Sequence, residues 1–505
     1  MQEPFRIHPQ NPKLFEFRSK PRVLICATEH YGAVVNRPFD FERYLADAAE
    51  KGQTLTRLFP LFRALQGCND PYSTCKAETP DYIAPFRRVG PKRALDGEPQ
   101  YDLRQWNPEF FDRLHRFLSL ASEYGIVVEV TLLSNTYSDA LWMLNPLHAK
   151  NNVNGLKLVE WPDYNSQRHA DLFEWQCTYI RKMVEETNRY DNVFYEICNE
   201  PCGSPSQKPG AFSPAEVNDW QRAIAKVIRQ TDPQKHLIAA QEATTAEPLD
   251  NPTTSVPTVT FQGALYHFEH PADRAFRELP FDIVNMHPLP NISYGGKLYH
   301  MGEFMMKELK LRAVRDFCLA TYAIPKPLNY DEDNSATQYK DVDGWTVQRK
   351  RAWTTLFSGG HYDMIDFSIT IYTPTGTSES QRCIRTWMKH LSAFIHSVDL
   401  VRARPLPDLL REKPCATLES VLAVTGEDYC IYLADERELD EPGAGEPISG
   451  NIVLDLPAGK FSMSCFSPVS GSYSPAIDLS GGKNLRVSLP EFRDDIVVRF
   501  RRVTS

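Results

Sequence analysis

The amino-acid sequence predicts an α/β protein: a (β/α)8 TIM barrel followed by a small C-terminal antiparallel β-sandwich. Two observations support this fold class. Strand-like and helix-like segments alternate eight times between about residues 20 and 400, and beyond residue 400 the segments become short strands separated by turn clusters. Alternating strands and helices indicate parallel strands with helical crossovers, and eight such units in roughly 380 residues match a barrel with insertions.

The predicted barrel strands are apolar runs rich in β-branched and aromatic residues, which suit a buried, pleated surface. They are expected at 22–28, 54–61, 126–133, 193–198, 236–240, 281–286, 326–330 and 362–369. A doubly wound sheet is the alternative, but the first predicted strand is not followed by the glycine-rich phosphate loop typical of many such folds.

The predicted helices have apolar residues at helical spacing, and Gly125 supplies a natural stop for one of them. They are expected at 39–51, 108–124, 167–189, 214–230, 298–322, 345–357 and 380–396, with a short helix near 271–279 in an otherwise irregular stretch, 244–280. The long insertions 62–107 and 134–166 lie where strands lead into helices, so we expect them to wall the active-site face.

The predicted domain boundary lies at residue 400, with the barrel at 1–400 and the sandwich at 401–505. The sandwich strands are expected at 420–424, 429–434, 451–456, 461–466, 484–488 and 496–501. This region has no tryptophan ladder, so a packing role is favoured over sugar binding.

Composition narrows the function classes. The chain has 505 residues and a net charge of −9 without a long basic run, which argues against a nucleic-acid partner. No apolar stretch approaches the ~20 residues of a membrane helix. The start lacks a signal-peptide pattern, so a cytoplasmic location is expected, or a secreted or periplasmic one if a signal was removed. Among 11 cysteines there is no zinc-like spacing, and a loop disulfide between Cys68 and Cys75 stays open.

The candidate chemistry starts at residues 193–201, where an apolar run ends in Asn199, Glu200 and Pro201. Proline cannot continue a central strand, so Glu200 is expected at a strand's C-terminal end, where barrel enzymes keep their catalytic groups. A second acidic cluster, Asp331-Glu332-Asp333, follows the seventh predicted strand. Strands four and seven face each other across a barrel mouth, and two opposed carboxylates are what glycosidic-bond cleavage requires.

On these residues the chain resembles glycoside hydrolase clan A, the retaining (β/α)8 superfamily that includes the family 5 enzymes. The resemblance implies that Glu200 is the acid/base and Glu332 the nucleophile. It also implies that Asn199 binds the sugar 2-hydroxyl and that Arg57, on strand two, lies near the nucleophile. No metal or cofactor is expected, and the partner is a carbohydrate substrate.

The chain departs from the family 5 pattern after strand six. His287 is followed by Pro288 and Leu289, so the tyrosine that would support the nucleophile is missing. Tyr330, Tyr31 or Tyr294 could take its place. Successive strand residues point to opposite faces, so Glu332 cannot face the pocket together with both neighbours; Asp331 or Asp333 stays an alternative nucleophile.

Further substrate contacts are expected around the pocket. His287 is a candidate hydrogen-bonding residue at its wall, and Glu242, after strand five, either binds substrate or caps the next segment. Trp142 and Trp161 lie in an inserted loop and are predicted to stack on sugar faces. Glu129 and Glu196 lie within strands and are expected in a buried polar layer.

The predicted function is retaining hydrolysis of a β-linked glycoside or oligosaccharide. A transglycosylase on the same site and a non-catalytic carbohydrate-binding barrel are the alternatives, although the latter should lack a catalytic acid and both are present. A metal-dependent barrel hydrolase would need several histidines at strand ends, and His287 alone is well placed. The sugar, the linkage, endo or exo action and the oligomeric state are not indicated.

Overall fold

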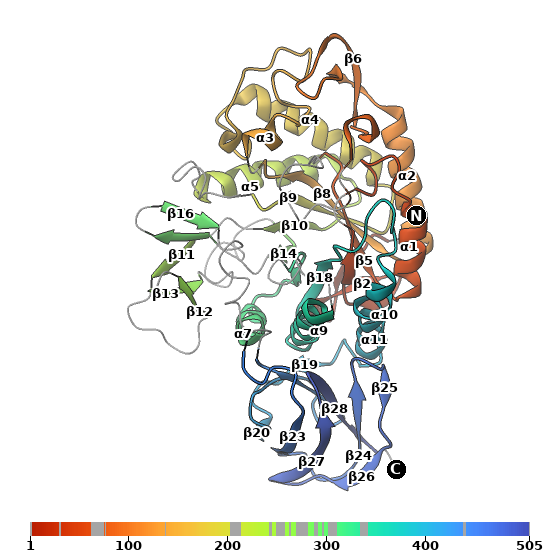
Figure 1. Cartoon of the computed structure of the whole chain (residues 1–505), viewed down its shortest axis with the longest axis vertical. Coiled ribbons are helices and arrows are strands. Elements are labelled where there is room, and N and C mark those ends of the chain that lie inside the picture. Colours follow the sequence, from red (N-terminus) through yellow and green to blue (C-terminus); the bar gives the residue numbers. More distant parts are fainter. Residues whose placement is uncertain are drawn as a thin grey trace.

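A computed structural model of the chain shows a barrel domain above an elongated β-sandwich (Figure 1). It describes residues 3–29, 32–61, 75, 77–136, 138–201, 214–241, 245–248, 258–261, 264–268, 281–286, 291–294, 297–300, 311–333, 342–437 and 441–503.

Within these residues, eight parallel strands form the barrel in the order β4-β18-β17-β14-β10-β9-β8-β5. Their bounds are β4 (Ile25–Thr28), β5 (Leu55–Leu58), β8 (Val127–Ser134), β9 (Val193–Asn199), β10 (Ile238–Gln241), β14 (Ile283–Asn285), β17 (Leu328–Tyr330) and β18 (His361–Ile365). The seam between β4 and β5 is bridged by Thr54, whose N–H donates to the Ile25 carbonyl (3.0 Å) and whose Oγ1 accepts from the Ile25 N–H (2.9 Å). The predicted (β/α)8 barrel is confirmed.

Helices surround this barrel. They are α1 (Phe41–Glu50), α2 (Pro108–Glu123), α4 (Ala170–Thr187), α5 (Pro214–Thr231), α7 (Leu311–Thr321), α9 (Val342–Phe357), α10 (Ser378–Arg382) and α11 (Ile384–Ile395), with short turns at α3 (Asp139–Trp142), η1 (Thr79–Asp81) and η2 (Trp161–Asp163). Helices α1 and α2 each bury one apolar face, whereas α9 is buried on all sides from Val347 to Phe357. The local sequence sets the ends of α2: the Asn107 side chain caps it by accepting from the Glu109 N–H, Pro108 opens it, and Gly125 follows with φ +71°.

The prediction was wrong for the region after β10. Residues 298–300 belong to a hairpin of β15 (Asn291–Tyr294) and β16 (Lys297–His300), and α7 comprises Leu311–Thr321. In the sequence, Gly295 and Gly296 stand between the β15 and β16 residues, and a Gly-Gly pair is typical of a two-residue hairpin turn. The stretch expected to be irregular contributes β11 (Thr245–Pro248), β12 (Thr258–Phe261) and β13 (Ala264–Phe268), giving a sheet of order β12-β13-β11-β15-β16. The helix expected near 271–279 lies outside the described residues.

Two further antiparallel units were not predicted. The chain begins with β1 (Arg6–His8), β2 (Asn11–Phe17) and β3 (Lys20–Arg22), so the first barrel strand starts later than expected. Phe5, Phe15 and Phe17 pack with Phe194 at the start of β9 and close the N-terminal end of the barrel. In the insertion 62–107, β6 (Phe86–Arg93) and β7 (Pro99–Trp106) form a hairpin.

The C-terminal region contains the predicted sandwich. One sheet, as far as it is described, comprises β19 (Arg404–Pro405), β21 (Thr417–Val424), β22 (Asp428–Asp435), β28 (Asp495–Arg502), β24 (Lys460–Ser467), β25 (Ser472–Tyr473) and β26 (Ile477–Ser480); the other comprises β20 (Leu410–Glu412), β23 (Ile448–Leu454) and β27 (Leu485–Phe492). The core of the barrel's α7, α9 and α11 side continues into this domain, where Trp353 stacks on Tyr432 with ring centroids 5.6 Å apart.

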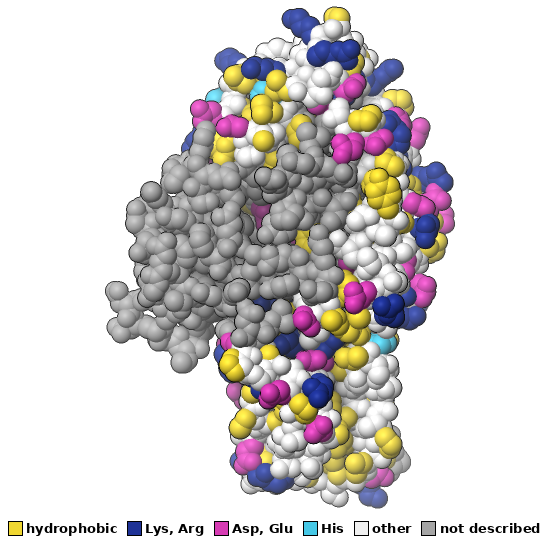
Figure 2. All heavy atoms as spheres, viewed as in Figure 1, with side chains coloured by type: hydrophobic (Ala, Val, Ile, Leu, Met, Phe, Trp, Pro, Cys, Tyr) yellow, Lys and Arg dark blue, Asp and Glu magenta, His cyan; other side chains and the backbone are white. Residues whose placement is uncertain are grey.

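Figure 2 shows acidic and basic side chains interspersed over the described part of one face. None of the described helices is long and apolar enough to cross a membrane.

Candidate active site

The guanidinium of Arg57, on β5, joins the ends of two opposite strands. Its Nη1 donates to Glu332 Oε2 (3.1 Å) and to the Asp331 carbonyl oxygen (3.2 Å), after β17. Its Nη2 donates to Asn199 Oδ1 (3.1 Å), the last residue of β9. The residue on strand two that the resemblance implicated therefore bonds directly to the candidate nucleophile and to the residue before the candidate acid/base.

The three acids after β17 take different positions. Asp331 points to the barrel interior, where Oδ2 lies 3.1 Å from Arg57 Nη2 and accepts from Asn285 Nδ2 at 3.3 Å. Asp333 Oδ2 accepts from the Tyr362 hydroxyl at 2.8 Å, and its Oδ1 lies 3.8 Å from Arg351 Nη1. Glu332 lies at the rim with 10% of its side chain exposed, whereas Asp331 has none exposed and Asp333 has 2%.

Glu200 has an uncommon backbone conformation. Its φ is +45°, in the left-handed region that non-glycine residues rarely adopt, and its N–H donates to Gln241 Oε1 (3.0 Å) at the end of β10. Such outliers cluster where the surrounding structure must hold a side chain in one direction. The half-buried Glu200 follows directly on Asn199, so both lie at the same edge of the barrel as Glu332.

A layer of buried carboxylates lies beneath these residues. Glu196 Oε2 accepts from Arg57 Nη2 (2.7 Å) and from the Thr131 hydroxyl (2.6 Å). Glu129 accepts from Asn285 and Asn329, and its Oε2 lies 3.8 Å from Arg57 Nε. The expectation that Glu129 and Glu196 form a buried polar layer is confirmed.

Burial dominates the electrostatics of this layer. Desolvation, reinforced by the Glu196 charge, raises the pKa of Glu129 well above its usual range. Desolvation also raises the pKa of Glu196, against the opposing pull of Arg57. Asp363, on β18, is completely buried, and this burial raises its pKa strongly against the opposing charge of Arg57. Glu129 and Glu196 were predicted for this layer from the sequence, but Asp363 was not.

Carboxylate oxygens of Glu129, Glu196 and Asp331 lie within 4.8 Å of one another, close enough to hold a cation. The Arg57 guanidinium, at 3.8, 2.7 and 3.1 Å from them, already supplies positive charge to all three. We therefore interpret the cluster as an arginine-centred ion network.

A small cavity lies beside this network at the end of β8. It is lined by Leu61, Ser134, Asn135, Thr136, Leu141, Asn145 and Tyr164. Asn135 connects it to the candidate site, because its N–H donates to the Asn199 carbonyl at 3.0 Å. The cavity has a volume of about 10 Å³, which is room for about one water molecule. No sequence pattern pointed to the residues that line it.

Three predicted substrate contacts are wrong. Tyr330 alternates with the inward-facing Asn329 on β17, so its ring packs among helix residues such as Cys318 and cannot support Glu332. Trp142 and Trp161 are each 2% exposed, and the Trp142 indole donates to the Val159 carbonyl (2.9 Å). Covered rings cannot stack on sugar, and these tryptophans instead form the core of the inserted loop.

Three other predicted contacts lie outside the described residues: Tyr31, Glu242 and His287. The backbone of Tyr294 is described in β15, but its side chain is not. Cys68 also lies outside the described residues. The Cys75 thiol is buried and donates to the Ile369 carbonyl at 3.4 Å.

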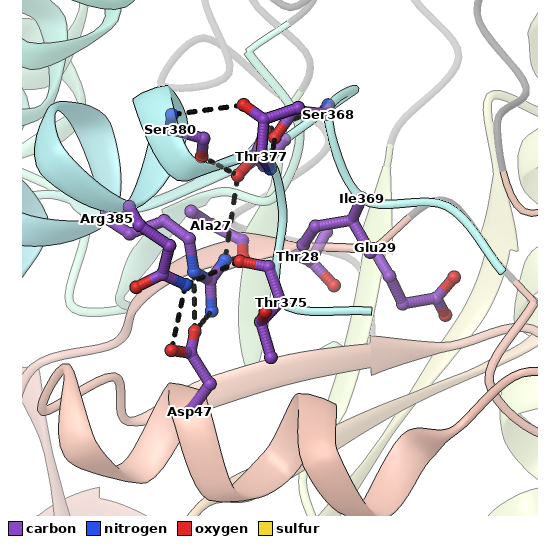
Figure 3. Close-up of polar contacts among 12 residues, drawn as sticks. Ala27, Thr28, Glu29, Asp47, Ser368, Ile369, Thr375, Thr377, Ser380 and Arg385 are labelled. Atoms are coloured by element: carbon purple, nitrogen blue, oxygen red, sulfur yellow. Dashed lines mark hydrogen bonds and ion pairs between the residues drawn. The ribbon is translucent and has the colours of Figure 1, made fainter. Parts of the chain in front are cut away.

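A second buried network anchors the loop after β18 (Figure 3). Arg385 on α11 donates to Asp47 on α1 (2.6 Å) and to the Ala27 carbonyl (3.1 Å), and Ser380 donates to Asp366. This network has no contact with Arg57 in the described structure, so Asp366 has a structural role in tying the loop to the helices.

Glu29, which follows β4, is also structural. It is 1% exposed, and its carboxylate accepts from the backbone N–H groups of Gly32 (2.6 Å) and Ala33 (3.0 Å). Burial raises the pKa of Glu29 to about 7, although these donors favour its charged form.

This pKa predicts a pH-dependent contribution to stability. Between about pH 4.5 and pH 7 the folded protein holds a proton on Glu29 that the unfolded chain has released, so stability falls as pH rises through this window. The loss should be about 3 kcal/mol, and Glu29→Gln should abolish it. Urea unfolding of wild type, Glu29→Gln and the exposed control Glu123→Gln measures the effect. A stability difference between wild type and the Glu29→Gln variant that does not change with pH would contradict the assignment.

Comparisons with known proteins agree with this geometry. Residues 87–271 match the family model described as cellulase, glycosyl hydrolase family 5. Over 86 residues the chain is 28% identical to an endoglucanase from Clostridium saccharobutylicum, and it spans 18% of that curated relative's length.

Solved structures match over nearly the whole chain. A candidate glycoside hydrolase from Bacteroides vulgatus aligns with 99% of this chain and 82% of its own, with 12% identity and a TM-score of 0.63. A family 5 glycoside hydrolase from the same organism covers 99% of this chain and 92% of its own at 12% identity and a TM-score of 0.57. These matches confirm the barrel with its appended sandwich, and the family-model match supports the expected resemblance to clan A.

Proposed function

We propose that the chain is a retaining glycoside hydrolase that cleaves a β-linked glycoside or oligosaccharide by double displacement. The observation that carries this proposal is the Arg57 guanidinium bonded at once to Glu332 and Asn199. It orients one carboxylate at the end of β17 and the residue beside a second carboxylate at the end of β9. The proposal assigns the reaction to residues 1–400 and a packing role to 401–505.

In this mechanism Glu332 is the nucleophile. The cationic Arg57 beside Oε2 favours the ionised carboxylate, which attacks the anomeric carbon while the glycosidic C–O bond breaks. Of the three adjacent acids, Asp331 is held in the inner layer and Asp333 is bonded to Tyr362, which supports Glu332 for this role.

Glu200 is the proposed acid/base. In the first step its carboxyl proton passes to the departing oxygen, and in the second its carboxylate takes a proton from the water that attacks the glycosyl–Glu332 ester. Asn199, whose Oδ1 accepts from Arg57, is the proposed partner of the sugar 2-hydroxyl, to which its Nδ2 would donate. Cleavage and release then leave both carboxyl groups in their starting states.

A screen of chromogenic β-glycosides and β-linked oligosaccharides tests the function, with glucans included because the curated relative is named an endoglucanase. Hydrolysis by wild type with retention of the anomeric configuration, followed by NMR, is expected. Release of the inverted anomer would refute the double displacement, and an absence of hydrolysis across the screen together with sugar binding would favour a non-catalytic barrel.

The acid/base role predicts a dependence on the leaving group. Glu200→Gln should lower kcat/KM by about 10²–10⁴-fold on alkyl or sugar leaving groups, which need protonation. A dinitrophenyl glycoside should show a much smaller loss in kcat/KM, because its leaving group departs as an anion. Glu123→Gln, at an exposed position on α2 outside the site, serves as the control; equal losses on both substrates would contradict the role.

A further inference from the structure

The position of Arg57 depends on groups deeper in the barrel than Glu332 and Asn199. Its Nη2 lies 2.7 Å from Glu196 Oε2, which is shorter than the 3.1 Å bonds to Glu332 and to Asn199. Glu196 itself is fixed by the Thr131 hydroxyl at 2.6 Å. β9, which ends at Asn199 directly before Glu200, also carries Glu196, three residues before Asn199, and so supplies the anchor of the guanidinium.

Acidic side chains outnumber basic ones around this anchor. Fully buried acids face Arg57 from four strands: Glu129 on β8, Glu196 on β9, Asp331 after β17 and Asp363 on β18. Among the described residues, Arg57 is the basic side chain that lies between these acids. Each ionised member of the layer weakens the positive potential that Arg57 presents to Glu332, so the charge of the layer bears on the nucleophile.

We propose that Glu196 is a positioning residue that, acting through Arg57, holds the guanidinium between Glu332 and Asn199 and attenuates its charge at the nucleophile. The catalytic part of this inference rests on the proposed function. The electrostatic part concerns the Glu332 carboxyl group and can be measured without any substrate.

The hydrogen bonding of Glu196 allows a substitution to remove its carboxylate charge and keep its hydrogen bonds. Both partners, Arg57 and Thr131, bond to Oε2, whereas Oε1 is buried with no hydrogen-bond partner among the described residues. In Glu196→Gln the amide oxygen can keep both bonds, and the amide nitrogen takes the place of the unpartnered atom. Glu196→Leu removes the bonds as well as the charge.

The first experiment is a ¹³C-NMR titration of the side-chain carboxyl groups in glutamate-labelled protein, with the Glu332 signal assigned by its absence in Glu332→Gln. In Glu196→Gln the midpoint of Glu332 should fall by about 0.5–1 pH unit, because a neighbouring negative charge is lost while Arg57 stays in place. The matched control is Asp366→Asn, a buried acid in the separate Arg385 network, which should leave the midpoint unchanged. An unchanged midpoint in Glu196→Gln would overturn the proposal.

The second experiment compares kinetics on a β-glycoside that wild type hydrolyses. Glu196→Gln should keep kcat within about threefold and move the acidic limb of the pH profile to lower pH. Glu196→Leu should lower kcat by about 10–100-fold with little change in KM, because Arg57 loses its anchor. Equal kcat values in both variants would overturn the positioning role. If no glycoside is hydrolysed but the NMR midpoint shifts, the proposed function fails while the link from Glu196 to Glu332 stands.

Discussion

Replacing Glu332 with glutamine is expected to lower kcat on a β-glycoside by at least about 10⁴-fold, because the covalent step loses its nucleophile. The amide keeps the size of the side chain and a hydrogen-bond acceptor for Arg57, so folding and substrate binding should change little. Initial rates with a chromogenic glycoside, corrected for active protein, measure the effect, and circular dichroism and the melting temperature confirm that the variant is folded.

The neighbouring acids provide the controls for this prediction. Asp333→Asn alters a residue bonded to Tyr362 and near Arg351, so it should reduce stability but keep kcat within about tenfold of wild type. Glu332→Ala should regain turnover when azide is added, because a small anion can occupy the space of the missing carboxylate and attack the anomeric carbon. Retention of more than a few per cent of kcat in Glu332→Gln, or its loss in Asp333→Asn instead, would move the nucleophile to another residue.

The strand ends were the part of the site that sequence could predict. Glu200 follows an apolar run that stops at Pro201, and Glu332 follows a short strand 132 residues later (332 − 200), so barrel topology alone brings both to one edge. Arg57 was predicted from the resemblance, and its contacts with Glu332 and Asn199 depend on a closed ring of strands that no local pattern specifies.

The wrong predictions of substrate contacts have a common physical cause. The residue type at a position does not determine the direction in which its side chain points. Tyr330 was expected in the site, but strand alternation turns it outward because Asn329 and Asp331 take the inward positions. Trp142 and Trp161 lie in a long polar insertion and were expected at its surface, yet such an insertion needs a core of its own, and the tryptophans supply it.

Hairpins inside the βα loops were missed for a related reason. Residues 298–322 have apolar residues at helical spacing, and the strand pairing of 297–300 with 291–294 depends on a partner earlier in the chain. The N-terminal sheet was missed for the same reason. Its aromatic residues are buried only when they pack against the open end of the barrel, where Phe5 stacks on Phe194. The pairing of strands and the closure of the barrel are tertiary effects, and they override the local propensity of a segment for helix or strand.

Replacing Asp495 with alanine is expected to destabilise the protein by about 3–5 kcal/mol, the usual cost of leaving one member of a buried ion pair alone. Asp495, on β28 of the sandwich, accepts from Arg349 of the barrel helix α9 through both oxygens, at 2.9 and 3.0 Å. The Tyr432 hydroxyl adds a third bond at 2.9 Å, and both charged groups are almost completely buried. Alanine would leave the guanidinium buried near Trp387 without its bidentate partner.

The adjacent acid makes a matched control, because Asp494 lies 3.6 Å from Arg349 Nη2 with 30% of its side chain exposed. Asp494→Asn tolerates the positive φ of that position and should cost less than about 1 kcal/mol. Urea and thermal unfolding should show a lower midpoint for Asp495→Ala and near-wild-type behaviour for Asp494→Asn. If the sandwich serves to pack against α9, as its continuous core with the barrel suggests, the Asp495 variant should also lose glycosidase activity at a lower temperature than wild type. An unchanged midpoint would mean that this interface contributes little to the stability of the barrel.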